Sequence, residues 1–150
     1  MREALKEARK AEAKGEIPVG AIIVKDGKII GRGHNQNRNK LDSTSHAEII
    51  AIKKACSNIK SSRLIGTTMY VTLEPCAMCA GAIVLSRIEN LVIGTSDPKS
   101  GACGSVLQVV ENEKLNHKVN ITRGLLEEDC SYILKDFFRK LREEKRGKKI

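Results

Sequence analysis

The chain has 150 residues, 41% of them hydrophobic and 30% charged, a balance typical of one soluble globular domain. No apolar run approaches the ~20 residues of a membrane-spanning helix, and the charged start at Met1 lacks the apolar centre of a signal peptide. We therefore expect one cytoplasmic domain over 1–150 with no membrane partner, and the net charge of +9 favours a polyanionic partner such as RNA.

The first third of the chain predicts a helix followed by a hairpin. An amphipathic stretch over 1–14 is typical of a helix, which Gly15 ends. A β run over 18–24 leads to Asp26-Gly27, a strong signal for a two-residue turn, and 28–33 returns as a second strand. A polar, irregular segment over 34–45 follows.

The rest of the chain alternates between helices and strands. We expect a helix over 46–56, a strand over 69–73 and a helix that starts at Pro75, a residue suited to a first helical turn. A strand over 91–95, a weaker one over 119–122 and a terminal helix over 126–145 complete the order. Helices between strands predict an α/β fold with a mixed central sheet and helices on its faces.

The C-terminal helix and tail, about 126–150, carry much of the excess positive charge. Between Lys135 and Lys149 there are eight Lys and Arg residues against three Asp and Glu. Such a segment can contact phosphates, although a solvated helix face with a frayed tail is the plainer interpretation. Phe138 and Leu141 are more typical of core positions than of a platform for stacked bases.

Two short motifs, each at the start of a predicted helix, contain the residues for metal chemistry. Cys76 and Cys79 are three residues apart, so they share one helix face, and the free N–H groups of a first turn favour their ionisation. His46 can supply a third ligand. Two thiolates and a neutral imidazole balance Zn²⁺ and leave the fourth tetrahedral position to water, whose pKa zinc lowers towards ~7.

Glu48, two residues after His46, is the candidate for proton transfer in this arrangement. A carboxylate beside the metal can take a proton from water and deliver protons to a ring nitrogen and a departing amine. On a helix His46 and Glu48 point to nearly opposite sides, so both reach the metal only if it lies off the helix end. Alternatively, Ser45-x-x-Glu48 is a capping box, and Glu48 then only closes the helix N-terminus.

The Cys pair also permits two other interpretations. A thiol redox pair would leave His46 and Glu48 unexplained, whereas a structural zinc knuckle needs a fourth ligand. The candidates for that ligand are Cys56, Cys103, Cys130, His34 and His117. The odd number of cysteines, five, argues against a disulfide framework in a cytoplasmic protein.

Together, His-x-Glu and Pro-Cys-x-x-Cys form the signature of zinc-dependent nucleobase deaminases. The chain further resembles the bacterial tRNA-specific adenosine deaminases of the cytidine deaminase-like superfamily over nearly its whole length. The segments that carry the resemblance are 18–21, 46–49, 70–82, 86–88, 101–105, 115–117 and 136–138. The last three are the most informative, because cytosine and guanine deaminases share the zinc motif but lack this C-terminal pattern.

The resemblance implies a three-layer α/β/α sandwich with about five strands and a homodimer with one zinc ion per subunit. It implies that His46, Cys76 and Cys79 bind zinc and that Glu48 shuttles protons while adenosine becomes inosine at the wobble position of a tRNA anticodon, with release of ammonia. By the same resemblance the anticodon stem-loop is the substrate, bound by Asn35, Ala47, Pro75 and Asp97, with weaker RNA contacts from Lys135, Arg139 and Arg142.

For two of these residues the sequence pattern has a plainer explanation, because Asn35 and Asp97-Pro98 are both typical of turns. Two other functions also remain open. A deaminase of free bases or nucleosides would need no basic RNA-binding surface, and an RNA-binding module with structural zinc would need no Glu48.

Overall fold

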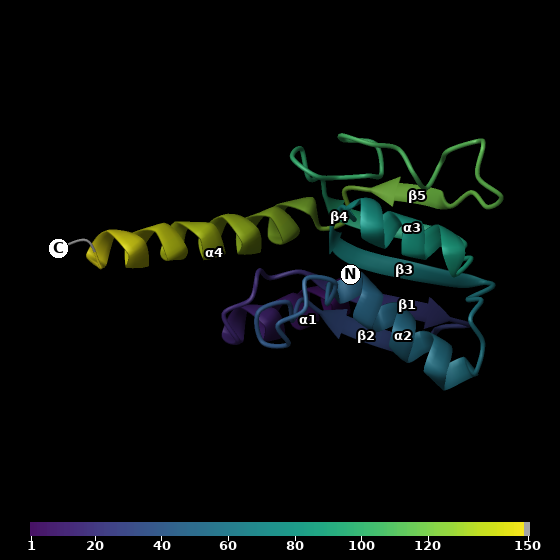
Figure 1. Cartoon of the computed structure of the whole chain (residues 1–150), viewed down its shortest axis with the longest axis horizontal. Coiled ribbons are helices and arrows are strands. Elements are labelled where there is room, and N and C mark those ends of the chain that lie inside the picture. The colour runs from purple at the N-terminus through teal and green to yellow at the C-terminus, as the bar shows by residue number, and fades with distance from the viewer. Residues whose placement is uncertain (149–150) are drawn as a thin grey trace.

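The computed structural model describes residues 1–148 and consists of one mixed sheet with helices on both faces (Figure 1). Lys149 and Ile150 of the predicted basic tail lie outside the described residues. The elements in chain order are α1 (Arg2–Ala13), β1 (Gly20–Lys25), β2 (Lys28–His34), α2 (Ala47–Ile59), β3 (Thr67–Leu73), α3 (Ala77–Leu85), β4 (Asn90–Thr95), β5 (Asn120–Arg123) and α4 (Glu127–Gly147). The predicted order and the five-stranded α/β fold are confirmed.

The strands follow the order β2-β1-β3-β4-β5. β1 pairs antiparallel with β2 and β3, whereas β3 with β4 and β4 with β5 pair parallel. Because β3 and β4 run the same way, their carboxyl ends meet at one edge of the sheet, where ligands of open α/β sheets bind. The cysteine motif follows β3 directly.

The register of the strands decides which helix covers which face. Gly33, Ala21, Val71 and Ile93 are paired in one row, and this face packs against α2 and α3 in the main hydrophobic core. A Cβ on Gly33 would lie 2.1 Å from the Ala47 carbonyl oxygen, so the glycine lets α2 approach the sheet closely.

The opposite face carries α1 and α4. Gly20 lies against α1, where a Cβ would come 2.0 Å from the Ala4 carbonyl oxygen, and Gly94 lies against Cys130 of α4. The three-layer arrangement implied by the resemblance is therefore present, with α2 and α3 on one face and α1 and α4 on the other (Figure 1).

The predicted hairpin turn is confirmed in its detail. Asp26 and Gly27 have φ values of 50° and 75°, the left-handed conformation that a two-residue type I′ turn requires at both positions. Glycine adopts this conformation freely and aspartate tolerates it, which is why this dipeptide closes β1 onto β2.

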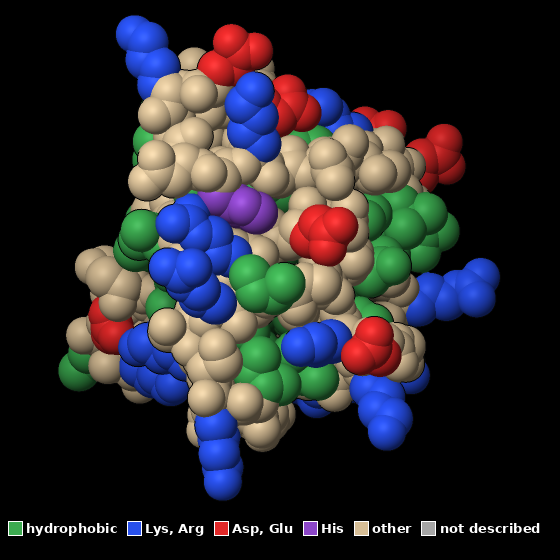
Figure 2. Space-filling model, turned by 90° about the vertical axis from the view of Figure 1, so that its right-hand side faces the viewer, with side chains coloured by type: hydrophobic (Ala, Val, Ile, Leu, Met, Phe, Trp, Pro, Cys, Tyr) green, Lys and Arg blue, Asp and Glu red, His purple; other side chains and the backbone are tan. Residues whose placement is uncertain are grey.

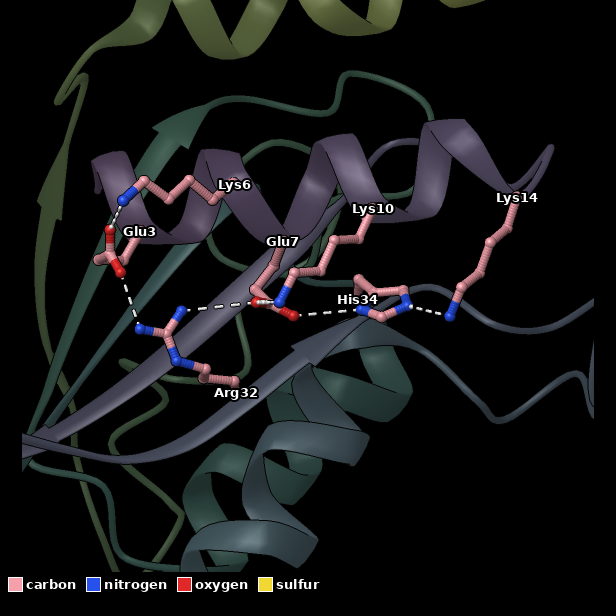
Figure 3. Close-up of polar contacts among 7 residues, drawn as sticks. All are labelled: Glu3, Lys6, Glu7, Lys10, Lys14, Arg32 and His34. Atoms are coloured by element: carbon pink, nitrogen blue, oxygen red, sulfur yellow. Dashed lines mark hydrogen bonds and ion pairs between the residues drawn. The ribbon is translucent and has the colours of Figure 1, made fainter.

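A polar network fastens α1 to β2 (Figure 3). The buried Glu7 carboxylate accepts from Lys10 at 2.8 Å and pairs with His34 Nδ1 at 3.1 Å, while Arg32 binds Glu3 at 2.7 Å. Lys14 Nζ lies 3.3 Å from His34 Nε2. Since an ammonium only donates, His34 accepts at Nε2 and donates from Nδ1 to Glu7, so its ring is neutral.

α4 leaves the body of the molecule along its longest axis, and its second half extends beyond the sheet (Figure 1). After Leu141 every described residue of this helix is exposed. Positive charge is not confined to α4, since Lys and Arg side chains are also spread over the opposite end of the molecule, mixed there with acidic ones (Figure 2). Within residues 1–148, no helix is long and apolar enough to cross a membrane.

Candidate active site

Three potential metal ligands converge where α2 and α3 begin. His46 is the N-cap of α2, Cys76 is the N-cap of α3 and Cys79 lies in the first turn of α3. Their ligand atoms all lie within 4.8 Å of one another. His46 Nδ1 is 3.6 Å from the Cys76 sulfur and 3.4 Å from the Cys79 sulfur. The three predicted ligands are thus brought together at two helix N-termini.

This donor set fits a zinc ion. Zinc–sulfur bonds of about 2.3 Å and zinc–nitrogen bonds of about 2.0–2.1 Å at tetrahedral angles place the two ligand atoms roughly 3.6 Å apart. The distances from Nδ1 to the two sulfurs agree with this value. Within the described residues, none of the five other candidate ligands joins the group, so it offers three protein ligands rather than the four of a structural knuckle.

The two thiols shift each other's pKa in opposite directions. Hydrogen bonds from Cys79 and His46 lower the pKa of Cys76 to about 3. The neighbouring Cys76 sulfur and burial raise the pKa of Cys79, because a second thiolate beside the first is disfavoured. A divalent cation between the sulfurs removes this repulsion, as expected of ligands that ionise when the metal binds.

Glu48 lies in the first turn of α2, is 4% exposed and lines the same cleft as His46 and Cys76. Burial raises the pKa of its carboxyl group to about 7. The alternative capping box does not form, since the Ser45 hydroxyl donates to Asp42 at 3.0 Å and His46 is the N-cap. His46 and Glu48 reach one cleft because the ligands lie off the end of α2, as the proposed chemistry requires.

The cleft has a volume of about 160 Å³ and is lined by two of the three ligands, His46 and Cys76. Asn35 is part of its wall, and the Asn35 amide oxygen accepts the free N–H of Ala47 at 3.0 Å. This bond satisfies one of the unpaired donors at the start of α2 and fixes the side chain. The lining residues are Ile17, Val19, Asn35, Asn37, His46, Glu48, Leu73, Glu74, Cys76, Asp97 and Ser100.

Comparison with known proteins agrees with this site. The model of the MafB19-like deaminase family matches residues 1–142. A tRNA-specific adenosine deaminase of Bacillus subtilis (strain 168) is 49% identical over 147 residues, which cover 98% of this chain and 91% of the relative. The one of Haemophilus influenzae is 53% identical over 150 residues, 99% of this chain and 87% of the relative. The chain belongs to the tRNA-specific adenosine deaminase family.

Two solved structures are similar to the structure of this chain. A structure from a study of A-to-I editing by tRNA:A34 deaminases at the wobble position superposes with a TM-score of 0.86 and 43% identity, covering 89% of this chain and 97% of the other. A guanine deaminase from Nitrosomonas europaea reaches a TM-score of 0.76 at 22% identity, over 89% of this chain and 80% of its own, and shares the fold.

Of the other three residues predicted to bind the substrate, only Asp97 lines the cleft. Asp97 lines the cleft, but its carboxylate accepts the Lys99 and Ser100 N–H groups at 3.0 and 3.2 Å, so the turn interpretation describes its contacts. Ala47 and Pro75 are buried and their side chains do not line the cleft. Their backbones instead hold neighbouring segments: the Ala47 N–H donates to Asn35, and the Pro75 carbonyl accepts the Ala102 N–H at 2.8 Å.

Several wall residues carried no signal in the sequence. Ile17 lies in the loop before β1, Leu73 is the last residue of β3, and Ser100 lies in a turn, which are all ordinary positions for these residue types. Asn37 is polar within a polar loop, although its amide oxygen is the one buried side-chain nitrogen or oxygen without a hydrogen-bond partner in residues 1–148. Only Glu74, adjacent to the cysteine motif, had a position that could have singled it out.

A larger groove of about 630 Å³ continues from the cleft of the deaminase towards α4. The two share Ile17, Leu73, Asp97 and Ser100. The expectation that Phe138 belongs to the core is wrong, because its ring is 38% exposed and lines this groove together with Lys135. Phe138 is not buried because the second half of α4 extends beyond the sheet and has no sheet surface to pack against (Figure 1).

The three cationic residues predicted to bind RNA are not equivalent. Lys135 lines the groove. Arg139 forms ion pairs within its own helix, to Asp136 at 2.7 Å and to Glu143 at 2.9 Å. Arg142 is exposed in the second half of α4. Lys135 is therefore the one that lies closest to the cleft.

Proposed function

We propose that the protein is a zinc-dependent deaminase that converts adenosine to inosine at the wobble position of a tRNA anticodon and releases ammonia. The observation that carries the proposal is the His46-Cys76-Cys79 group beside the buried Glu48 in one cleft. The names of the relatives and of the similar structure, which concern tRNA-specific adenosine and tRNA:A34 deaminases, support the substrate.

His46, Cys76 and Cys79 would hold one zinc ion per subunit. When bound, zinc supplies a Lewis acid that lowers the pKa of a coordinated water towards ~7. Glu48 takes the proton of the attacking water and delivers protons to the ring nitrogen beside C6 and to the departing amine. A carboxyl group whose pKa lies near neutral pH can both accept and donate in this way.

The wall of the cleft orients the base. The oxygen of the Asn35 amide is held by the Ala47 N–H, so the amide NH₂ remains to donate to an acceptor on the nucleoside. Asp97 and Ser100 form another part of the wall, at the entrance shared with the groove. Such enzymes act on a base that is splayed out of its loop, so pocket shape and flanking nucleotides set specificity.

The groove would hold the nucleotides that flank the target adenosine. Ile17, Pro98 and Phe138 offer apolar surface to bases, and Lys135 offers positive charge to a phosphate at the same place. A free base would occupy only the cleft and leave this groove unused. The groove thus favours an RNA substrate over a free base.

We also propose that the protein is a homodimer joined through α3. This helix, Ala77–Leu85, has no charged residue, yet Leu85 is 78% and Met78 is 37% exposed on one stripe. Val106 and Leu107 in the loop before β5 are also exposed. Exposed apolar surface on a helix that carries two metal ligands suits a second copy of the chain better than water.

The dimer is tested by changing Leu85 to Glu, which places a charge on the apolar stripe. We expect the mass in solution, measured by light scattering after size exclusion, to fall from two chains to one. Leu41→Glu is the matched control, because Leu41 is 93% exposed on a polar loop. A wild-type protein that elutes as a monomer at micromolar concentration would exclude the dimer.

The substrate is tested with an anticodon stem-loop RNA that has adenosine at the wobble position, beside free adenosine, guanine and cytosine. We expect inosine to form in the stem-loop alone. Conversion of a free base alone would retain the zinc chemistry and assign the protein to the free-base deaminases. A folded, zinc-loaded protein that converts none of them would favour an RNA-binding module with structural zinc.

A further inference from the structure

A second buried glutamate in the wall of the cleft, Glu74, does not belong to the metal group. It is 5% exposed and stands between the end of β3 and the Pro75-Cys76 turn. Its side chain does not point to a cationic partner. Instead it faces the loop 97–105, which contains two residues of the cleft wall, Asp97 and Ser100.

The Glu74 carboxylate collects hydrogen bonds from both ends of this loop. One oxygen accepts the Asp97 N–H at 3.1 Å, and the other accepts the N–H groups of Cys103 at 2.9 Å and Ser105 at 3.2 Å. The Ser105 hydroxyl also donates to Glu74. The two oxygens thus accept four hydrogen bonds, as an ionised carboxylate can.

The loop also packs tightly around Glu74. A Cβ on Gly101 would lie 2.4 Å from the carboxyl carbon of Glu74, so only glycine allows the backbone to come this close. The next residue, Ala102, donates its N–H to the carbonyl of Pro75 at 2.8 Å. The loop is thereby tied at both ends and in the middle to the two residues that precede the ligand Cys76.

We propose that Glu74 is a positioning residue of the deaminase, whose carboxylate holds loop 97–105 so that Asp97 and Ser100 form the substrate-binding wall beside the metal turn. The proposal rests on the function proposed above. Glu74 acts on binding of the nucleotide rather than on proton transfer, because its oxygens are occupied by four donors of the loop.

A carboxylate is required for geometric reasons. Both oxygens of Glu74 accept, and each faces at least one backbone N–H. Glutamine would replace one oxygen by an NH₂ group, which would then meet N–H donors rather than acceptors. Glu74→Gln therefore keeps the volume of the side chain and removes the hydrogen bonds to at least one end of the loop.

The test compares Glu74→Gln with Glu7→Gln, which alters another buried glutamate, 3% exposed, on the far side of the sheet. Zinc content, amide hydrogen exchange over 97–105, and KM and kcat for the stem-loop are measured. For Glu74→Gln we expect roughly tenfold faster exchange in the loop and a roughly tenfold higher KM, with zinc retained and kcat little changed. Glu7→Gln should change neither the exchange nor KM.

Ser105→Ala is the milder variant, which removes one of the four donors and keeps the carboxylate. It should shift loop exchange and KM in the same direction by a smaller factor, and it decides the question if Glu74→Gln does not fold. Exchange and KM equal to those of Glu7→Gln would overturn the proposal, as would a loss of kcat at unchanged KM. Loop exchange needs no substrate, so it decides the positioning role even if the wild type fails to convert the stem-loop.

Discussion

The metal site and the second half of α4 are built on opposite principles. At the metal site, α2 and α3 begin against the sheet, and the side chains of Glu48 and Cys79 are almost completely buried. The second half of α4 has no buried side chain, and its ion pairs, such as those of Arg139 with Asp136 and Glu143, lie within the helix itself.

This difference in burial suits the two tasks proposed for the protein, which are catalysis at the metal site and binding of the negatively charged RNA along α4. Metal ligands and a proton shuttle must be held to within a fraction of an ångström, which only a packed core provides. A phosphate backbone attracts positive charge over the ~8–10 Å of electrostatic screening, so a solvated helix can contribute without precise support. Changes at the metal site should therefore abolish activity, whereas changes on α4 should alter affinity by degrees.

The largest effect is expected at Cys79, the completely buried cysteine among the three ligands. Cys79→Ala removes one of three ligands, so zinc content should fall from about one ion per chain to nearly none, with loss of activity. Metal analysis of the purified protein measures this. Cys56→Ala is the control, because Cys56 is outside the ligand group and should retain zinc. Stoichiometric zinc in Cys79→Ala would refute the assignment of this ligand.

Glu48→Gln should separate the metal from the proton transfer. The variant keeps the shape of the side chain and all three ligands, so zinc should stay bound while kcat for inosine formation falls by about 10²–10⁴-fold. Glu7→Gln, in which a buried glutamate away from the cleft is changed, should keep kcat. Full activity of Glu48→Gln would leave the metal as a structural element and remove the contrast between the metal site and α4.

The cations of α4 should rank by their distance from the groove. Lys135→Glu should weaken stem-loop binding and reduce the slope of log affinity against log salt by roughly one. Arg142→Glu should do less, and Arg139→Glu should also do less because two carboxylates already balance this charge. Binding titrations at several salt concentrations measure the three slopes. Equal effects would mean that α4 acts as a diffuse charge and not through the groove.

The smallest effect is expected at the α1–β2 contact (Figure 3), which belongs neither to the metal site nor to α4. Burial lowers the pKa of His34 below its usual range, so the folded protein takes up a proton less readily than the unfolded chain. The free energy of unfolding should therefore decline as the pH falls below about 6.5, and it should be insensitive to His34 above that value.

His34→Gln provides the comparison, because glutamine can still donate to Glu7 but does not titrate. Chemical denaturation between pH 8 and 5 should show a shallower decline for the variant than for the wild type. Glu7 contributes in a separate window, since its lowered pKa makes its contribution vanish only at more acidic pH. Identical pH profiles would show that the His34 ring does not titrate in this range.

Much of this molecule could be read from local patterns. The Asp26-Gly27 turn and the helix starts at the two motifs were predictable because they depend on neighbouring residues alone. The position of Phe138 was not, because helical spacing gives a face but not the residue at which the sheet beneath it ends. The predicted roles of the site residues, the single domain over 1–150 and the cytoplasmic location stay predictions.

The sequence by itself determined the ligand types, their spacing on a helix and the charge of the tail, because these are properties of residues close together in the chain. Only the tertiary structure decided that His46 meets Cys76 and Cys79 off the end of α2, because this depends on Gly31 and Gly33 letting the helix lie close to the sheet. It also decided that Glu74 holds a loop more than twenty residues away, since such a contact follows from strand order and not from spacing.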